Sequence, residues 1–394
     1  MRSEEFVERY SVDRYHTDSL KWDSLESKFG DKELISMWIA DMEFQVPEQV
    51  KEKMLERIQH GVFGYSNVPE SYYDAYSKWM EERYQFPLKK EWIRFSTGCV
   101  TSIAWMIHAF TQPKDHCLIL APVYYPFFNV VTNNDRQLTV VDLTYQDGYF
   151  TMDYEAIEKA IIEDDVKLFV QCSPQNPTGR VWTEEELEKV LAICKKHDVI
   201  VVSDEIHQDF LIGDHPFVPA AAVGNGHYND IIVMLSSASK TFNLAGLLHA
   251  HIIIPDDHLR AKFDSFASGL NRTEMNIMGL VATEAAYTYG ADWLTGLIET
   301  IKENYEYLRE TLHHHYPDMT VCSLEGTYLV LIDMRSYVSP ECLPNFIQNR
   351  CHLAVDYGDV FGEITNGFIR LNLATDPKYV KQAVANIIHG ISDL

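Results

Sequence analysis

Short apolar runs alternate with amphipathic segments through the middle of the chain. The amphipathic stretch Thr183–His197 has Glu186 three residues after Thr183, a capping-box signature at a helix start. The apolar runs are nearly continuous, which is typical of parallel strands covered by helices on both faces. The pattern predicts an α/β fold with a mostly parallel sheet. We expect its strands at Cys117–Ala121, Thr139–Leu143, Leu168–Cys172, Val199–Asp204, Ile231–Ser236 and His251–Ile254.

The pattern changes after about Leu280. Long helical stretches follow, and then three strand-like runs at Thr327–Asp333, Ala354–Asp356 and Phe368–Leu373. This change predicts a second, smaller α+β domain. The first 45 residues show no alternation of strands and helices. We therefore expect an N-terminal arm at 1–45 that packs on the small domain, a large domain at 46–280 and the small domain at 281–394.

Composition narrows the classes of function. The chain has 394 residues, of which 46% are hydrophobic, so it can bury a substantial core. A formal net charge of −25 argues against nucleic acid and anionic membranes as partners. Seven scattered cysteines without a Cys-x-x-Cys pair fit a reducing compartment. With no apolar run of about 18 residues and no signal-peptide pattern, we expect a soluble, acidic, cytoplasmic protein.

Lys240 is the first candidate for chemistry. It follows the predicted strand Ile231–Ser236 and stands among small and hydroxylated residues that include Ser237 and Ser239. A lysine there projects from the carboxyl end of a buried strand, where open α/β sheets bind their ligands. An amine beside hydroxyls that could bind phosphate suits a Schiff base with pyridoxal phosphate. Taken alone, a surface lysine after a strand would be the more common explanation.

Three polar or aromatic residues follow other predicted strands. Asp204 could pair with a cofactor ring nitrogen, and taken alone it could equally be an N-cap or loop aspartate. Asn176, in the string Ser-Pro-Gln-Asn-Pro-Thr-Gly-Arg, could donate to a phenolate oxygen or could simply form a turn. Tyr124 offers a face for stacking on a pyridine ring or could belong to the core.

Two further features suit a charged ligand. The backbone of Gly98, Cys99 and Val100 precedes the apolar helical stretch Ile103–Phe110, and free N–H groups at a helix start bind phosphate. A plain strand-to-helix turn is the alternative, and Cys99 lacks an identifiable base that would make it a nucleophile. Arg370 lies inside an apolar strand, so it needs a partner. That partner could be a substrate α-carboxylate or a structural carboxylate.

Four strings occur in order: Ser-Pro-Gln-Asn-Pro-Thr-Gly, Ser-Asp-Glu-Ile-His, Ser-x-x-Ser-Lys-Thr-Phe and Phe-Ile-Arg-Leu-Asn. Together they resemble the fold-type I pyridoxal-phosphate enzymes, the aspartate aminotransferase superfamily, over essentially the whole chain. The resemblance implies a large domain with a seven-stranded, mostly parallel sheet and a smaller α+β domain. It also implies that Lys240 carries the cofactor, Asp204 pairs with its pyridine nitrogen, Asn176 contacts its phenolic oxygen and Arg370 holds the substrate α-carboxylate.

The sequence departs from that superfamily at two positions. His207 stands where aminotransferases usually have tyrosine, and Leu248 stands where they have a phosphate-binding arginine. The resemblance then implies that the phosphate is bound by the Gly98–Val100 backbone, Ser237, Ser239 and a tyrosine from a partner subunit. Tyr65 matches the position of that tyrosine, which implies a homodimer with shared sites.

The arm narrows the resemblance to a subgroup. Lys21-Trp22-Asp23 and the run Met37–Phe44, together with Asp-Glu-Ile-His, are similar to the MalY/PatB group of cystathionine β-lyases and cysteine-S-conjugate β-lyases. In such relatives the backbone at the position of Ala40 lines the substrate carboxylate. The resemblance implies β-elimination of L-cystathionine, L-cysteine or cysteine S-conjugates to pyruvate, ammonia and a thiol. Lys240 would act as the general base, and both Lys240 and Tyr124 are candidates to handle protons at the leaving sulfur.

Two alternatives stay open at this point. A class I/II aminotransferase would use the same lysine, aspartate and arginine. A regulatory protein that only retains the cofactor is the alternative from another class, although no motif indicates a protein partner. We expect no metal site, because consecutive residues such as His313-His314-His315 point in different directions on a helix.

Overall fold

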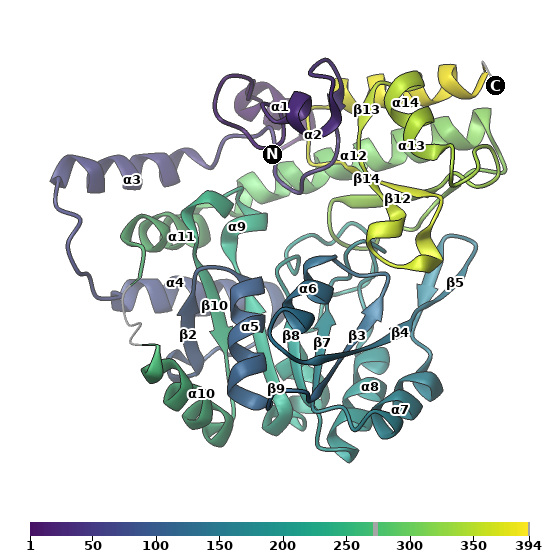
Figure 1. The fold of residues 1–394 in the computed structure, drawn as a ribbon. Helices are drawn as coiled ribbons and strands as arrows, with labels where there is room; N and C mark the ends of the chain where they lie inside the picture. Colours follow the sequence, from purple (N-terminus) through teal and green to yellow (C-terminus); the bar gives the residue numbers. More distant parts are fainter. Residues whose placement is uncertain (271–274, 393–394) are drawn as a thin grey trace.

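A seven-stranded sheet forms the centre of the molecule in the computed structural model, which describes residues 1–270 and 275–392 (Figure 1). Five neighbouring strands, from β9 to β4, run parallel, and β10 is antiparallel to both of its neighbours. The predicted mostly parallel sheet is confirmed. In spatial order its strands are β2 (Ile93–Ser96), β10 (Ala250–Ile253), β9 (Ile232–Ser236), β8 (Ile200–Asp204), β7 (Leu168–Cys172), β3 (His116–Ala121) and β4 (Gln137–Asp142).

Helices cover both faces of this sheet, as its apolar strands require. One hydrophobic core lies between the sheet and the helices α5 (Cys99–Phe110), α6 (Pro126–Thr132) and α10 (Asp257–Gly269). A larger core includes residues of the helices on the other face and extends into the C-terminal part. Those helices are α4 (Glu70–Tyr84), α7 (Tyr154–Glu163), α8 (Glu184–Lys196) and α11 (Ile277–Tyr289).

Most local predictions for this region are confirmed. The six expected strands are present with ends shifted by at most two residues. The capping box at α8 is present, because Thr183 and Glu186 each accept the other's backbone N–H. The edge strand β2 was not predicted, since it is only four residues long and contains Arg94, whose side chain pairs with Asp264. A small hairpin of β5 (Thr144–Gln146) and β6 (Tyr149–Thr151) was also missed.

The C-terminal part contains a four-stranded antiparallel sheet and long helices. Its sheet order is β11 (Thr320–Val321), β12 (Leu329–Asp333), β15 (Phe368–Asn372) and β14 (Asp356–Tyr357). The single strand expected at Ala354–Asp356 is wrong, because the chain there divides between two sheets. Residues of β13 (Leu353–Ala354) pair with β1 (Ile35–Ser36) of the arm, and Asp356 begins β14. The principal helices here are α12 (Ala291–His315), α13 (Leu343–Asn345) and α14 (Pro377–Ser392).

The N-terminal arm contains α1 (Ser3–Tyr10) and α2 (Leu25–Phe29), and it packs against the C-terminal helices. Phe6 meets Trp293 of α12 edge-on at a ring distance of 5.3 Å, and Trp22 lies 5.0 Å from Tyr379 of α14. After the arm, α3 (Glu48–His60) lies at the edge of the molecule, packed along α11 (Figure 1). The domain limits at residues 45 and 280 stay a prediction. None of the described helices is long and apolar enough to cross a bilayer.

A buried ion pair holds the arm together. The Lys21 ammonium donates to one carboxylate oxygen of Glu43 at 2.9 Å, and the Trp22 indole donates to the other at 2.9 Å. Lys21 is fully buried and Glu43 is only 2% exposed. Because neither charge reaches water, each depends on the other for stabilisation.

Removing this counter-charge should destabilise the fold. We expect Glu43→Gln to cost about 3–5 kcal/mol, because it leaves the Lys21 ammonium buried and unpaired. Thermal unfolding followed by circular dichroism should show a midpoint lower by several degrees. The double variant Lys21→Met/Glu43→Gln should recover part of the loss. An unchanged midpoint in Glu43→Gln would show that water reaches the pair.

Candidate active site

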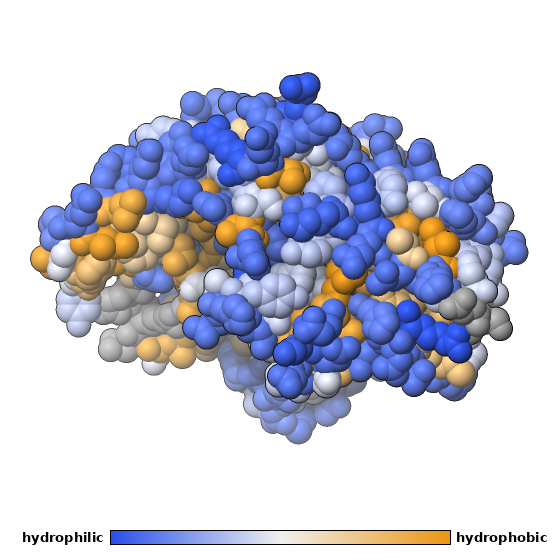
Figure 2. Space-filling model, turned by 90° about the horizontal axis from the view of Figure 1, so that it is seen from above, coloured by the Kyte–Doolittle hydropathy of each residue, from blue (hydrophilic) through white to orange (hydrophobic). Residues whose placement is uncertain are grey.

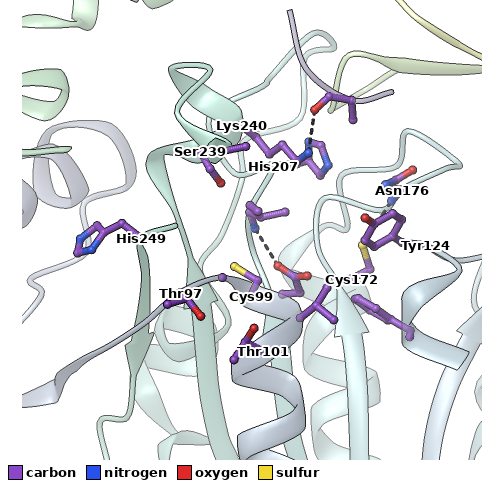
Figure 3. A pocket seen from close by; sticks show the side chains of 17 residues that line it. Thr97, Cys99, Thr101, Tyr124, Cys172, Asn176, His207, Ser239, Lys240 and His249 are labelled. Atoms are coloured by element: carbon purple, nitrogen blue, oxygen red, sulfur yellow. Dashed lines mark hydrogen bonds between the residues drawn. The ribbon is translucent and has the colours of Figure 1, made fainter. Parts of the chain in front are cut away.

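A cavity of about 220 Å³ opens at the carboxyl ends of the central parallel strands (Figure 3). Its walls come from the loops after β3, β7, β8 and β9 and from the first turn of α5. This is the edge where open α/β sheets bind ligands. The lining residues are Ala40, Thr97, Gly98, Cys99, Val100, Thr101, Tyr124, Phe127, Cys172, Asn176, Asp204, Ile206, His207, Ser239, Lys240, Ala245 and His249.

Most of the residues expected at a cofactor site lie together in this cavity. Three do not line it. Ser237 donates its hydroxyl to the backbone oxygen of His249 at 2.6 Å, and Tyr65 is 93% exposed on the surface. Arg370 lies behind the wall and contacts the lining residue Asn176. The predicted residues that line the cavity are Ala40, Gly98, Cys99, Val100, Tyr124, Asn176, Asp204, His207, Ser239 and Lys240.

Lys240 is held by the short helix α9 (Ala238–Thr241), directly after β9. The Ser237 hydroxyl caps this helix by accepting from the Ser239 N–H. On the next residue, the Thr241 hydroxyl donates at 2.7 Å to Asp209, which is 1% exposed. These contacts fix the backbone on both sides of Lys240, so its amine has a defined position at the cavity.

The Lys240 amine donates to the backbone oxygen of Ala40 at 2.7 Å (Figure 3). The Tyr328 hydroxyl donates to the same oxygen at 2.9 Å. Burial lowers the pKa of Lys240, although the nearby Asp41 carboxylate opposes the shift. A lower pKa increases the unprotonated fraction, which is the form that acts as a nucleophile or a base.

Asp204 ends β8, the parallel neighbour of β9. One of its carboxylate oxygens accepts from the Ile206 N–H at 3.2 Å, and the side chain is 4% exposed. Burial raises the pKa of Asp204 to about 6. A cation placed against this carboxylate would favour its ionised form, because burial is what disfavours the charge.

The start of α5 faces the cavity without a side-chain cap. Its N-cap residue is Gly98, and no side chain within the described part of the chain forms a capping hydrogen bond there. A Cβ atom added at Gly98 would meet no atom within 4 Å, so the backbone here is open to an incoming ligand. Unpaired N–H groups and the helix dipole together bind anions such as phosphate.

His207 is buried and Tyr124 half-buried beside these groups, and both keep neutral forms. Burial lowers the pKa of His207 well below its usual range, and Lys240 and Arg370 add to the shift. The His207 Nδ1 atom is buried without a hydrogen-bond partner in the described structure. Burial also raises the pKa of Tyr124 to about 12, so its hydroxyl stays protonated near neutral pH.

Arg370 lies on β15 with its guanidinium already engaged. It donates to the Asn176 side-chain oxygen at 2.8 Å and forms an ion pair with Asp356. Its face lies 4.6 Å from the Phe361 ring. The Nε–H of Arg370 is buried and has no partner among the described residues. Both alternatives for the partner of Arg370 therefore keep support. Asp356 is a structural carboxylate partner, and the unused Nε–H is a donor that a substrate carboxylate could use.

The donor set fits a phosphorylated pyridine aldehyde. The uncapped α5 start suits the phosphate, the buried Asp204 suits a ring nitrogen that carries a proton, and the Lys240 amine suits the aldehyde. Sequence reasoning missed other contributors, because their position depends on distant contacts. His249 directly precedes β10 and lies beside Thr97, because β10 runs antiparallel to β2. Tyr328 directly precedes β12. No local motif marks these residues.

Comparisons with known proteins agree with this geometry. The aminotransferase class I and II family model matches residues 32–387. Cystathionine beta-lyase PatB of Bacillus subtilis is 36% identical over 361 residues, which are 91% of this chain and 93% of that protein. Protein MalY of Escherichia coli is 30% identical over 96% of this chain and 97% of its own length. Cystalysin from Treponema denticola, solved with pyridoxal 5'-phosphate, is 30% identical with a TM-score of 0.92, covering 97% of this chain and 98% of its own.

The family match extends over most of the chain, and two relatives reach at least 30% identity over nearly their full length. The chain belongs to the aminotransferase class I and II family. The predicted fold and the predicted resemblance to the MalY/PatB group are confirmed. The individual residue roles remain predictions.

Glu205, next to Asp204, should make the stability of the protein depend on pH. It is fully buried, and burial raises its pKa to about 8. The folded state therefore keeps a proton that the unfolded state loses above about pH 4.3, so this contribution to stability falls as pH rises toward 8. We expect Glu205→Gln to unfold at a temperature a few degrees higher than wild type at pH 8.5 and at a similar temperature at pH 5. The exposed control Glu188→Gln should unfold at the wild-type temperature at both pH values. Equal unfolding midpoints for Glu205→Gln and wild type at pH 8.5 would contradict the raised pKa of Glu205.

Proposed function

We propose that this protein is a pyridoxal-phosphate-dependent carbon–sulfur lyase. It cleaves the β-carbon to sulfur bond of a cysteine-type substrate and releases pyruvate, ammonia and a thiol. One observation carries the proposal: a partly buried lysine amine of lowered pKa, a buried carboxylate and an uncapped helix start line a single cavity. The named activity of the PatB relative supports the same reaction class. L-Cystathionine, L-cysteine and cysteine S-conjugates are the proposed substrates, and the cytoplasm is the proposed location.

The cavity would hold the cofactor by three kinds of contact. Backbone N–H groups of the Gly98–Val100 turn and the Ser239 hydroxyl would bind the phosphate. Asp204 would hold a proton on the ring nitrogen, and Tyr124 would stack on the ring. Asn176 and the neutral His207 would border the ring oxygen. When bound, pyridoxal phosphate supplies an electron sink for negative charge at the substrate α-carbon.

The chain's own residues would then manage the protons. The lowered pKa of Lys240 favours a free amine, which would remove the α-proton of the substrate as general base. The unused Nε–H of Arg370 and the backbone at Ala40 would orient the substrate carboxylate. Tyr124 keeps its proton because its pKa is raised to about 12, so it could donate that proton to the departing sulfur. Water finally hydrolyses the released product to pyruvate and ammonia.

A homodimer would complete the site. Several apolar side chains of α3 and the loop after it are exposed, including Val62 and Phe63, and Tyr65 is 93% exposed. Figure 2 shows apolar residues gathered at the end of the molecule where α3 lies. Soluble monomers rarely expose a contiguous apolar patch of this kind. We infer that this surface packs on a second copy and that Tyr65 reaches the phosphate of the partner's site.

Lys240→Ala tests the proposed function. Pyruvate formation from L-cystathionine should fall by about 10³-fold or more, because the general base is lost. Absorbance spectra should show that the variant still binds cofactor, but in a form that gel filtration removes. The exposed control Lys159→Ala should keep wild-type rates. Wild-type turnover in Lys240→Ala would end the proposal.

A second variant tests the dimer. Val62→Asp/Phe63→Asp places two charges on the proposed contact and should yield a monomer by light scattering, where wild type has twice the chain mass. The monomer should also bind the cofactor phosphate more weakly, because the partner's Tyr65 is absent. Tyr65→Phe should weaken cofactor binding while it leaves the dimer intact. A wild-type protein that is monomeric at micromolar concentration would refute the shared site.

A further inference from the structure

A second cavity, of about 430 Å³, borders the site beyond Arg370. Its described lining residues are Tyr125, Phe128, Asn129, Asp356 and Val360. Tyr125 directly follows Tyr124 of the active site, and Asp356 pairs with Arg370 across β14 and β15. Asp356 therefore stands between the outer cavity and the guanidinium that would hold the substrate carboxylate.

Asp356 links the two cavities. Its carboxylate accepts from the Arg370 Nη2 atom, and its side chain is 18% exposed. Among the described lining residues of the outer cavity, Asp356 alone carries a charge. The rest are two aromatic rings, an amide and a valine, none of which neutralises a carboxylate.

The balance of charge changes when substrate binds. Without substrate, the Arg370 guanidinium faces a single carboxylate, that of Asp356. A substrate α-carboxylate on Arg370 would place two negative charges against a single positive charge in a largely buried setting, which is costly. Burial already raises the pKa of Asp356 despite the nearby Arg370, so this carboxylate is poorly solvated. A cation delivered to the outer cavity would restore the balance.

We propose that Asp356 and the outer cavity form the subsite for the leaving group and select sulfur amino acids whose leaving group carries an ammonium. This inference rests on the proposed lyase function and names its substrate class. L-Cystathionine has such a group, because its distal half ends in an α-amino acid. Asp356 thus has two alternating partners: Arg370 in the free enzyme and the distal ammonium of the substrate in the complex.

Three substrates with leaving groups of similar length isolate the effect of the charge at the distal end. S-(3-aminopropyl)-L-cysteine carries a distal ammonium, S-butyl-L-cysteine carries none, and S-(3-carboxypropyl)-L-cysteine carries a distal carboxylate. A hydrogen-bonded charge pair of 1.5–3 kcal/mol corresponds to roughly 10- to 100-fold. We therefore expect wild type to cleave the aminopropyl compound with a kcat/KM about 10-fold or more above that of the butyl compound, and the carboxypropyl compound least well.

Asp356→Asn should have two opposite effects. The preference for the aminopropyl compound should vanish, because the counter-charge is gone. The KM for β-chloro-L-alanine, which has no distal group, should fall, because Arg370 no longer shares its charge with Asp356. The control Asp359→Asn removes an exposed carboxylate three residues away and should keep the wild-type preference.

The outcomes separate this inference from the function on which it rests. A wild-type enzyme that cleaves β-chloro-L-alanine but shows no preference for the ammonium would overturn the subsite and leave the lyase intact. An equal loss of kcat/KM for every substrate in Asp356→Asn would make Asp356 only a structural support for Arg370. Failure of wild type to release pyruvate from any of these compounds, β-chloro-L-alanine included, would reject both proposals.

Discussion

The position of one partly buried lysine amine is the constraint on which the rest of the site depends. A buried ammonium is costly unless polar groups surround it or its pKa falls. Here the Ala40 carbonyl accepts from Lys240, and burial lowers the pKa of the amine. The same carbonyl accepts from Tyr328, the residue directly before β12. One oxygen atom therefore joins the N-terminal arm, the C-terminal sheet and the short helix after β9.

The backbone of the arm must be held in place for the Ala40 oxygen to meet the Lys240 amine. The side chain of Asn372 donates to the backbone oxygens of Ile39 and Asp41, on either side of Ala40. Asn243, three residues after Lys240, holds the following part of the arm through the backbone oxygens of Met42 and Phe44. The buried pair of Lys21 and Glu43 fixes the arm's own shape. Stability of the arm and geometry of the cavity are thus set by the same contacts.

Much of this arrangement could be predicted from the sequence, because it follows from local order along parallel strands. Asp204, Asn176 and Tyr124 come just at or after strand ends, and the carboxyl ends of parallel strands meet at one edge. Contacts between distant elements could not be predicted in this way. The pairing of Asp356 with Arg370 depends on the register of β14 against β15, and His249 lines the cavity only because β10 runs back along β2. The strand β2 was missed because it is short and contains a charged residue.

The most direct test of the account is the number of pyruvate molecules that each active site releases from L-cystathionine when no keto acid is present. Purified, cofactor-loaded protein would be mixed with excess substrate, and pyruvate and ammonia would be followed over time. The account predicts sustained release of both products in equal amounts, far beyond one per site. A single turnover per site that stops, and resumes only when a keto acid is added, would contradict it and indicate an aminotransferase.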